Sequence, residues 1–117
     1  MNALLIWYPK CSTCQKAKAW LDEHGVACET RHIVEEPPTA AELAQWHARS
    51  GLPLKRFFNT SGLVYKKEQI KDRLPGMSEE EQYALLATNG MLIKRPILLL
   101  GERVLVGFRP AEWEAAL

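Results

Sequence analysis

The start of the chain joins a short apolar run to a Cys-x-x-Cys motif, and this combination limits the folds available to it. Residues 3–8 are apolar and end at Pro9, which is typical of a short buried strand. The two cysteines of the motif, Cys11 and Cys14, follow directly. Apolar residues then recur at helical spacing, which predicts a helix over residues 12–24. The cysteines are therefore expected where a strand turns into a helix.

The rest of the pattern predicts strands near both ends of the chain and helices in its middle. Two capping boxes, Thr39-x-x-Glu42 and Ser78-x-x-Glu81, each predict the start of a helix. The expected elements are a strand over 26–33, a helix from Thr39 to near Gly51, a short helix over 64–72, a helix from Ser78 to Gly90, a hairpin of strands 97–100 and 104–106, and a closing helix over 110–117. This βαβ, helices, ββα order predicts one α/β domain over residues 1–117, with a mixed sheet and a helical insertion at about 37–92.

Composition excludes several classes of protein. With 117 residues, 47% hydrophobic and 25% charged, the chain has the size and balance of one ordinary globular domain. The net charge of +1 is spread along the chain, so direct binding of nucleic acid is not expected. There is no apolar run of the roughly 18 residues needed to span a membrane, and the first residues do not resemble a signal peptide. We therefore expect a cytoplasmic protein without membrane contact.

The Cys-x-x-Cys motif indicates thiol chemistry in such a compartment. Three cysteines are too few for a disulfide framework. A helix start offers free N–H groups and the positive end of the helix dipole, and both favour a thiolate at Cys11 over a thiol. Lys10 adds positive charge beside it, and Cys14 lies one turn away, close enough in principle for a disulfide.

A zinc site is the main alternative interpretation of the motif. Cys28 and His32 would supply the other two ligands. If residues 26–33 form a strand, however, these two residues lie about 13 Å apart at roughly 3.3 Å per residue, too far to bind one ion. Cys28 is better explained as a small buried residue, and His24 and His47 have ordinary explanations at a helix end and on a helix face. No metal ligand is therefore predicted.

Two arginines gain interest only in combination with Cys11. Arg95 precedes Pro96 at the start of a predicted strand, and Arg109 follows Val106-Gly107-Phe108. Each one alone is explained as a solvated surface charge. Beside an anionic sulfur, however, guanidinium groups with paired donors are suited to holding an oxyanion.

Together these motifs give the chain a resemblance to a known family. It carries Tyr8-Pro9-Lys10-Cys11-Ser12-Thr13-Cys14, Phe57-Phe58-Asn59-Thr60-Ser61-Gly62, Met91-Leu92-Ile93-Lys94-Arg95-Pro96 and Val106-Gly107-Phe108. In this order they resemble the ArsC-like family, which contains glutaredoxin-coupled arsenate reductases and redox-sensing regulators of the Spx and MgsR type. The resemblance extends from Leu4 to about Trp113 and implies a thioredoxin-like, glutaredoxin-type fold with a cis Arg95–Pro96 peptide bond.

The resemblance also implies roles for individual residues. Cys11 matches the nucleophile that attacks arsenate, and Arg95 and Arg109 match two of the three arginines that hold the oxyanion. The third arginine is Asn59 here, and the family histidine four residues before the nucleophile is Trp7. Cys14 matches the second cysteine of the Spx-type switch. The residues expected to bind substrate beside these are Lys10, Ser12, Thr13, Asn59 and Pro96.

Two functional hypotheses of different classes follow. The first is a thiol oxidoreductase in which Cys14 resolves the adduct formed on Cys11, with no cofactor beyond an external reductant such as glutathione, glutaredoxin or thioredoxin. The second is a redox-sensing regulator in which the same disulfide controls binding to the RNA polymerase α-subunit. A scaffold with a vestigial cysteine pair is a third, simpler interpretation. A monomer is expected in each case.

Overall fold

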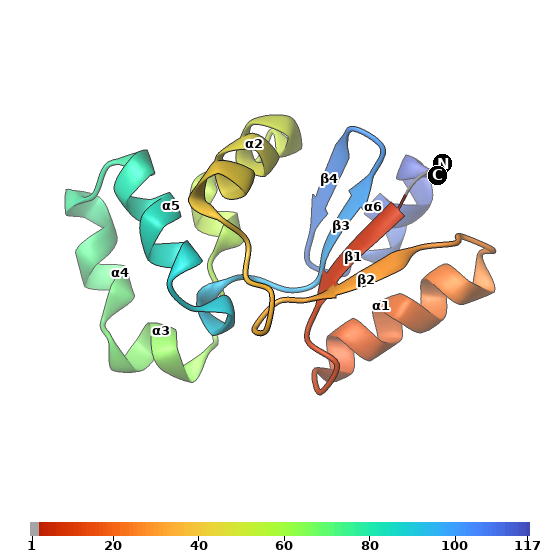
Figure 1. Ribbon diagram of the computed structural model, residues 1–117, viewed down its shortest axis with the longest axis horizontal. Helices are drawn as coiled ribbons and strands as arrows, with labels where there is room; N and C mark the ends of the chain where they lie inside the picture. The colour runs from red at the N-terminus through yellow and green to blue at the C-terminus, as the bar shows by residue number, and fades with distance from the viewer. Residues whose placement is uncertain (1–2) are drawn as a thin grey trace.

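The computed structural model describes residues 3–117 and is built around one four-stranded sheet (Figure 1). Its strands are β1 (Ala3–Trp7), β2 (Glu29–His32), β3 (Ile97–Leu100) and β4 (Arg103–Val106), in the order β2-β1-β3-β4. β1 is parallel to β2, so the chain must cross over between them, and α1 (Ser12–Glu23) makes this crossover. β3 is antiparallel to both β1 and β4. The predicted mixed α/β sheet is therefore confirmed.

Helices lie in two groups. α1 and α6 (Pro110–Ala116) stay with the sheet, whereas the other helices form a separate group on the opposite side in Figure 1. That group comprises α2 (Ala40–Ser50), η1 (Leu54–Phe57), α3 (Leu63–Lys67), α4 (Ile70–Arg73), η2 (Leu74–Gly76), α5 (Glu79–Ala87) and η3 (Gly90–Leu92). These helices all lie between β2 and β3 in the chain, which confirms the predicted helical insertion.

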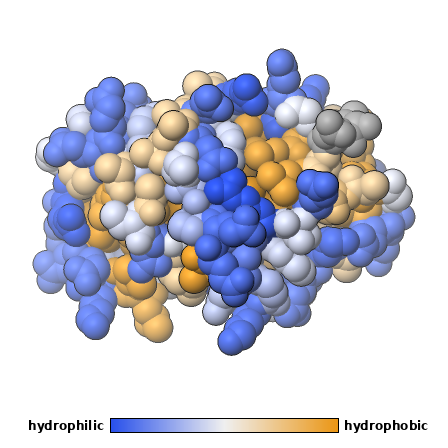
Figure 2. Space-filling view, viewed as in Figure 1, coloured by the Kyte–Doolittle hydropathy of each residue, from blue (hydrophilic) through white to orange (hydrophobic). Residues whose placement is uncertain are grey.

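The alternation of side chains along the strands divides the core in two. Leu5 and Leu98 point to a cluster that also holds Leu21 of α1 and Trp113 of α6. Ile6, Ile97 and Val106 point to the opposite face of the sheet and belong to a second cluster, formed mainly with the insertion. In the space-filling view, apolar residues gather over the sheet and hydrophilic residues over the connection from β2 to α2 (Figure 2). The sheet thus carries one core on each face.

Some boundaries differ from the predictions. The second strand begins at Glu29 rather than at residue 26, because it is an edge strand with exposed residues and pairs only with β1. The helix predicted over 64–72 is broken into α3 and α4 at Gln69, which has φ 51°. His24, expected at a helix end, is the exposed C-cap of α1 and stacks on Trp20. Residues 1 and 2 of the predicted domain lie outside the described residues.

Within residues 3–117, no helix has both the length and the apolar character that crossing a membrane requires.

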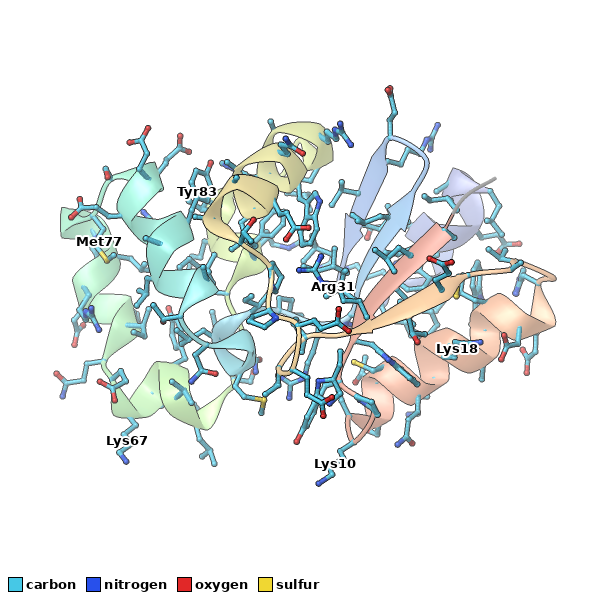
Figure 3. The ribbon with its side chains drawn as sticks, in the orientation of Figure 1. Lys10, Lys18, Arg31, Lys67, Met77 and Tyr83 are labelled. Carbon is cyan, nitrogen blue, oxygen red and sulfur yellow. The ribbon has the colours of Figure 1, made fainter. Side chains whose placement is uncertain are left out.

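A bidentate ion pair joins β2 to the first insertion helix. Arg31 donates from Nη1 to Glu42 Oε2 at 2.7 Å and from Nη2 to Glu42 Oε1 at 2.9 Å, and it also donates to the Glu36 and Pro37 carbonyls. Figure 3 shows Arg31 between the two elements. Glu42 also completes the predicted capping box with Thr39. The Glu42 carboxylate therefore both caps the start of α2 and connects this helix to Arg31 of β2.

This ion pair makes stability depend on pH in the acid range. Hydrogen bonding to Arg31, with help from the Thr39 amide, lowers the pKa of Glu42 from 4.5 to about 2 despite its partial burial. The carboxylate thus stabilises the fold above pH 4.5, and this contribution is lost as the pH falls towards 2. Glu42→Gln keeps a capping box residue but removes the charge. We expect this variant to lose about 1 kcal/mol of unfolding free energy near neutral pH, allowing for solvent screening.

Urea unfolding of both proteins across this acid range tests the prediction. The difference between wild type and Glu42→Gln should shrink as the pH falls through the acid range. A constant difference would show that the carboxylate charge does not stabilise the fold.

Candidate active site

Cys11 occupies the position just before the first helix. It is the N-cap of α1, with extended backbone angles, and its carbonyl accepts the first helical hydrogen bond from Gln15 N–H at 3.0 Å. No side chain caps this helix start. The loop before it is held by a bond from Cys11 N–H to the Tyr8 carbonyl at 2.9 Å and by Gln15 Nε2, which donates to the Pro9 carbonyl at 2.8 Å. The half-buried thiol is therefore fixed at the open N-terminus of a twelve-residue helix.

The surroundings of Cys11 favour its thiolate. Burial by itself raises the pKa of Cys11, but the backbone N–H of Cys14, the Cys14 thiol and the Arg95 guanidinium all stabilise the negative charge. These groups outweigh burial, so the pKa of Cys11 lies below its ordinary value. The sequence-based expectation of an activated thiol therefore agrees with the geometry.

Cys14 has the opposite character. It is completely buried in the first turn of α1. Burial, together with the neighbouring Cys11 sulfur, raises the pKa of Cys14 to about 12. Both thiols are free, and the Cys14 thiol interacts with the Cys11 sulfur directly. The pair thus joins a thiol whose pKa is lowered to a neighbouring thiol whose pKa is raised.

Arg95 reaches the site from the loop before β3. Its peptide bond to Pro96 is cis, as the family resemblance implies. The centre of its guanidinium lies 5.3 Å from the centroid of the Tyr8 ring, a cation–π arrangement. Its Nε and Nη1 atoms are buried and have no hydrogen-bond partner within residues 3–117. Arg95 therefore interacts with Cys11 and retains two further donors that have no partner among these residues.

Removing the charge of Arg95 tests its part in activating Cys11. In Arg95→Gln, the pKa of Cys11 is expected to rise because a positive charge and a donor beside the thiolate are lost. The measurement is the pH dependence of alkylation of Cys11. Arg103→Gln, on β4 outside the cleft, is the matched control and should leave the profile unchanged. An unchanged pH profile in Arg95→Gln would show that Arg95 does not lower the pKa of Cys11.

Cys11 opens into a cleft of about 640 Å³ between the insertion and the end of the sheet. The residues that line it are Cys11, Thr13, Pro53, Lys55, Arg56, Phe58, Asn59, Thr60, Ser61, Lys94, Arg95, Val106, Gly107, Phe108 and Arg109. Five of these are lysine or arginine and none is acidic. The cleft is therefore suited to an anion that reaches the sulfur.

The predicted site residues fall into two groups. The structure brings five of them together in the cleft: Cys11, Thr13, Asn59, Arg95 and Arg109. Four others do not line it. Ser12 is exposed, Lys10 projects outward (Figure 3), Pro96 is buried, and Cys14 lies beneath Cys11. The roles of all nine residues stay predictions.

Sequence reasoning missed the cations on the insertion side of the cleft. Lys55 and Arg56 belong to η1, directly before the Phe57–Gly62 motif, and Lys94 directly precedes Arg95. The sequence feature that could have identified these three cations is their position beside two motifs of the family resemblance. Only tertiary contacts bring them together, since Phe58 bridges to Ile93 and Lys94 N–H donates to the Phe57 carbonyl at 2.8 Å.

The residues that the structure describes contain no set of side chains placed to bind zinc. Nowhere in the described part of the chain do three His, Cys, Asp or Glu side chains gather as they would around a metal ion. Cys28 is half-buried against the core between α1 and the sheet, and burial raises its pKa. His32 instead accepts hydrogen bonds on Nδ1 from the Val34 and Glu35 amides.

Comparison with known proteins agrees with this geometry. The family model described as "ArsC family" matches residues 6–116, which is almost the whole chain. The chain belongs to the ArsC family. A solved structure described as a possible arsenate reductase from Streptococcus mutans UA159 superimposes with a TM-score of 0.90 and 41% identity, covering 98% of each chain. This ArsC-family likeness confirms the predicted thioredoxin-like fold.

Two curated relatives show how varied the family is. The chain is 52% identical over 114 residues to the uncharacterized protein YusI of Bacillus subtilis (strain 168), covering 97% of both chains. It is 32% identical over 109 residues to the global transcriptional regulator Spx of Streptococcus agalactiae, covering 93% of this chain and 78% of that one. Membership of the ArsC family alone therefore does not choose between an enzyme and a regulator.

Proposed function

We propose that this ArsC-family protein is a thiol oxidoreductase that uses Cys11 as nucleophile and Cys14 as resolving cysteine. The observation that carries the proposal is the position of Cys11, whose pKa is lowered, at the start of α1 in a cleft with five cations and no acid. Such a site attracts an anionic substrate and supplies the nucleophile for it. Its substrates are small oxyanions such as arsenate, or oxidised thiols.

The first step forms a bond to the Cys11 sulfur. With arsenate, the thiolate attacks arsenic and an oxygen leaves as water after protonation. With a disulfide, the thiolate attacks one sulfur and the other leaves as a thiolate. Arg95 and Arg109 line the cleft and stabilise the negative charge on the substrate during this step.

The second step transfers two electrons from the pair of thiols to the substrate. The Cys14 sulfur loses its proton and attacks the Cys11 sulfur, so that an S–S bond forms and the Cys11–substrate bond breaks. The bonding electrons leave with the product, which is arsenite or a second free thiol. An external reductant such as glutathione, glutaredoxin or thioredoxin would then restore the two thiols.

The two pKa values set the order of these steps. Burial, with help from the Cys11 charge while Cys11 is ionised, raises the pKa of Cys14 to about 12, so Cys14 does not compete as nucleophile. Once Cys11 is bound to substrate, that charge is gone, and Arg95 favours ionisation of Cys14. Formation of the first bond therefore removes one of the two causes that raise the pKa of Cys14, and burial remains as the other.

A single-turnover experiment tests the proposal. The fully reduced protein is mixed separately with arsenate and with small disulfides, and the Cys11–Cys14 disulfide is followed by mass spectrometry of acid-quenched samples. Oxidation of this pair, with one product released per protein, is the expected result for at least one substrate class. If none of them oxidises the pair faster than the buffer alone, the protein is not an oxidoreductase of this kind.

The similarity to Spx favours a second candidate function. Here the Cys11–Cys14 disulfide would control binding to the RNA polymerase α-subunit. A pull-down with the C-terminal domain of that subunit, using reduced and oxidised protein, distinguishes the two. Binding that depends on redox state, without turnover of any substrate, favours the regulator.

A further inference from the structure

Arg95 needs a support that its hydrogen bonds do not provide. Its Nε and Nη1 atoms are buried without a hydrogen-bond partner, and no carboxylate of residues 3–117 forms an ion pair with it. Its interaction with Cys11 is strongest while that sulfur is ionised, so it weakens once the sulfur is bonded to a substrate. An arginine side chain also loses many rotamers when it is ordered. Another group must therefore fix the guanidinium in place.

The ring of Tyr8 provides such a support. The guanidinium carbon of Arg95 lies over this ring, 5.3 Å from its centroid. The face of an aromatic ring carries negative charge density and attracts a cation placed over it, more strongly where water is excluded. This attraction acts on the charge of the guanidinium as a whole and uses none of its N–H groups. Tyr8 can thus hold Arg95 and leave its donors free for Cys11 and a substrate.

The Tyr8 ring is itself held from two sides. The carbonyl of Tyr8 accepts a hydrogen bond from the Cys11 N–H at 2.9 Å, so Tyr8 belongs to the turn that leads to the thiol. The ring packs in a T-shaped arrangement against His32, the last residue of β2, with 5.6 Å between the ring centroids. His32 is fixed in turn, since its Nδ1 accepts hydrogen bonds from the Val34 and Glu35 amides at 3.1 Å each. The ring is therefore fixed relative to both the Cys11 turn and the end of β2.

We propose that Tyr8 is a positioning residue whose ring holds the Arg95 guanidinium in the orientation in which it interacts with Cys11. The inference goes beyond the proposed oxidoreductase function, on which it rests only for the role of Cys11 as nucleophile. The alternative is that Tyr8 only fills space, since it is half-buried and packs against the core formed with the insertion. The two interpretations differ in one respect. A positioning role requires Arg95, whereas a packing role does not.

Removing the ring at position 8 tests the proposal. The rate of alkylation of Cys11 is measured against pH, with the modified residue identified by mass. Tyr8→Leu keeps an apolar side chain without a ring, and it should lower the rate below the titration midpoint roughly three- to tenfold, as the loss of one partly buried cation–π contact implies. Tyr8→Phe keeps the face of the ring and should retain the wild-type profile. A wild-type profile in Tyr8→Leu, or an equal loss of rate in Tyr8→Phe, would overturn the proposal.

A replacement of nearly the same shape separates charge from packing. Pentafluorophenylalanine at position 8 fills almost the same space as phenylalanine, but its fluorines reverse the charge of the ring face, so it should repel the guanidinium. We expect it to lower the rate in the same way as Tyr8→Leu. A profile equal to that of Tyr8→Phe would show that the ring only fills space. This comparison decides the question even if Tyr8→Leu does not fold.

A double-mutant cycle shows whether Tyr8 acts through Arg95. In a protein that already carries Arg95→Gln, Tyr8→Leu should cause little further change in the profile. An equal loss of rate with and without Arg95 would contradict the positioning role. Tyr83→Leu is the matched control, because Tyr83 of α5 is also half-buried and contacts a histidine, His47, at 2.6 Å, but does not line the cleft (Figure 3). It should keep the wild-type profile.

The outcomes separate this inference from the proposed function, because alkylation needs no substrate. If no substrate oxidises the Cys11–Cys14 pair, the oxidoreductase function fails, and the alkylation profiles still decide the role of Tyr8. If substrates oxidise the pair but the profile does not respond to the ring at position 8, the positioning role fails and the oxidoreductase function stands.

Discussion

Replacing Cys11 with serine is expected to lower the rate of substrate reduction by at least roughly 10³-fold, as loss of an enzyme's nucleophile commonly does. Serine is similar in size but has no readily formed anion at neutral pH, so the groups that stabilise the Cys11 thiolate would have nothing to activate. The measurement is the single-turnover formation of product. Cys28→Ser is the matched control, because Cys28 is a thiol outside the cleft with a raised pKa, and it should react like the wild type.

Cys14→Ser should behave differently from Cys11→Ser. The first step remains possible, so the Cys11–substrate adduct should accumulate and be visible by mass as one substrate half bound per protein. Because the buried serine cannot attack it, the adduct should persist until an external thiol is added. Normal turnover in Cys14→Ser would show that Cys14 is not the resolving cysteine.

Gly90→Ala is expected to destabilise the fold by about 3 kcal/mol or more, at the upper end of overpacking effects. Gly90 is buried at the start of η3, where an added Cβ would lie 2.1 Å from the Ile33 carbonyl oxygen and 2.7 Å from its carbon. These are backbone atoms, and the Ile33 N–H donates to the carbonyl of Trp7, the last residue of β1, at 2.8 Å. Neither can rotate away, so η3 must move from the sheet.

Urea unfolding of Gly90→Ala and Gly76→Ala measures this effect. Gly76 ends η2 and has no neighbour within 4 Å of an added Cβ, so its substitution should change stability little. Because η3 leads directly into Lys94 and Arg95, the Gly90 variant should also reduce the reactivity of Cys11. If both variants were equally stable, the close approach of η3 to the sheet would not be part of the native fold.

Local signals in the sequence predicted most of the fold. The capping boxes at Thr39 and Ser78 both form, since they depend only on residues three positions apart. The strand–cysteine–helix order at the start of the chain is likewise local. The beginning of β2 was less predictable, because this edge strand exposes Glu29 and Thr30 and lacks the burial pattern of the inner strands. The left-handed residue between α3 and α4 is a glutamine, which gives no warning of a break.

The site was predictable only in part for a similar reason. Cys11 could be placed from the residues around it, and the family resemblance supplied Arg95, Arg109 and Asn59. Lys55 and Arg56 reach the cleft because the insertion folds back on residues 92–94 through the bond from Asn59 N–H to the Leu92 carbonyl and the Phe58–Ile93 bridge. Such contacts leave no regular pattern in a single sequence.

The central claim is that the surroundings of Cys11 lower its pKa and so favour the thiolate, and the most direct test is a measurement of that pKa. The rate of alkylation of Cys11 is measured against pH in the Cys28→Ser protein, with the modified residue identified by mass. We expect a single titration with its midpoint below that of an ordinary cysteine. A rate that rises only around the pKa of an ordinary thiol, near 8.5, would contradict it.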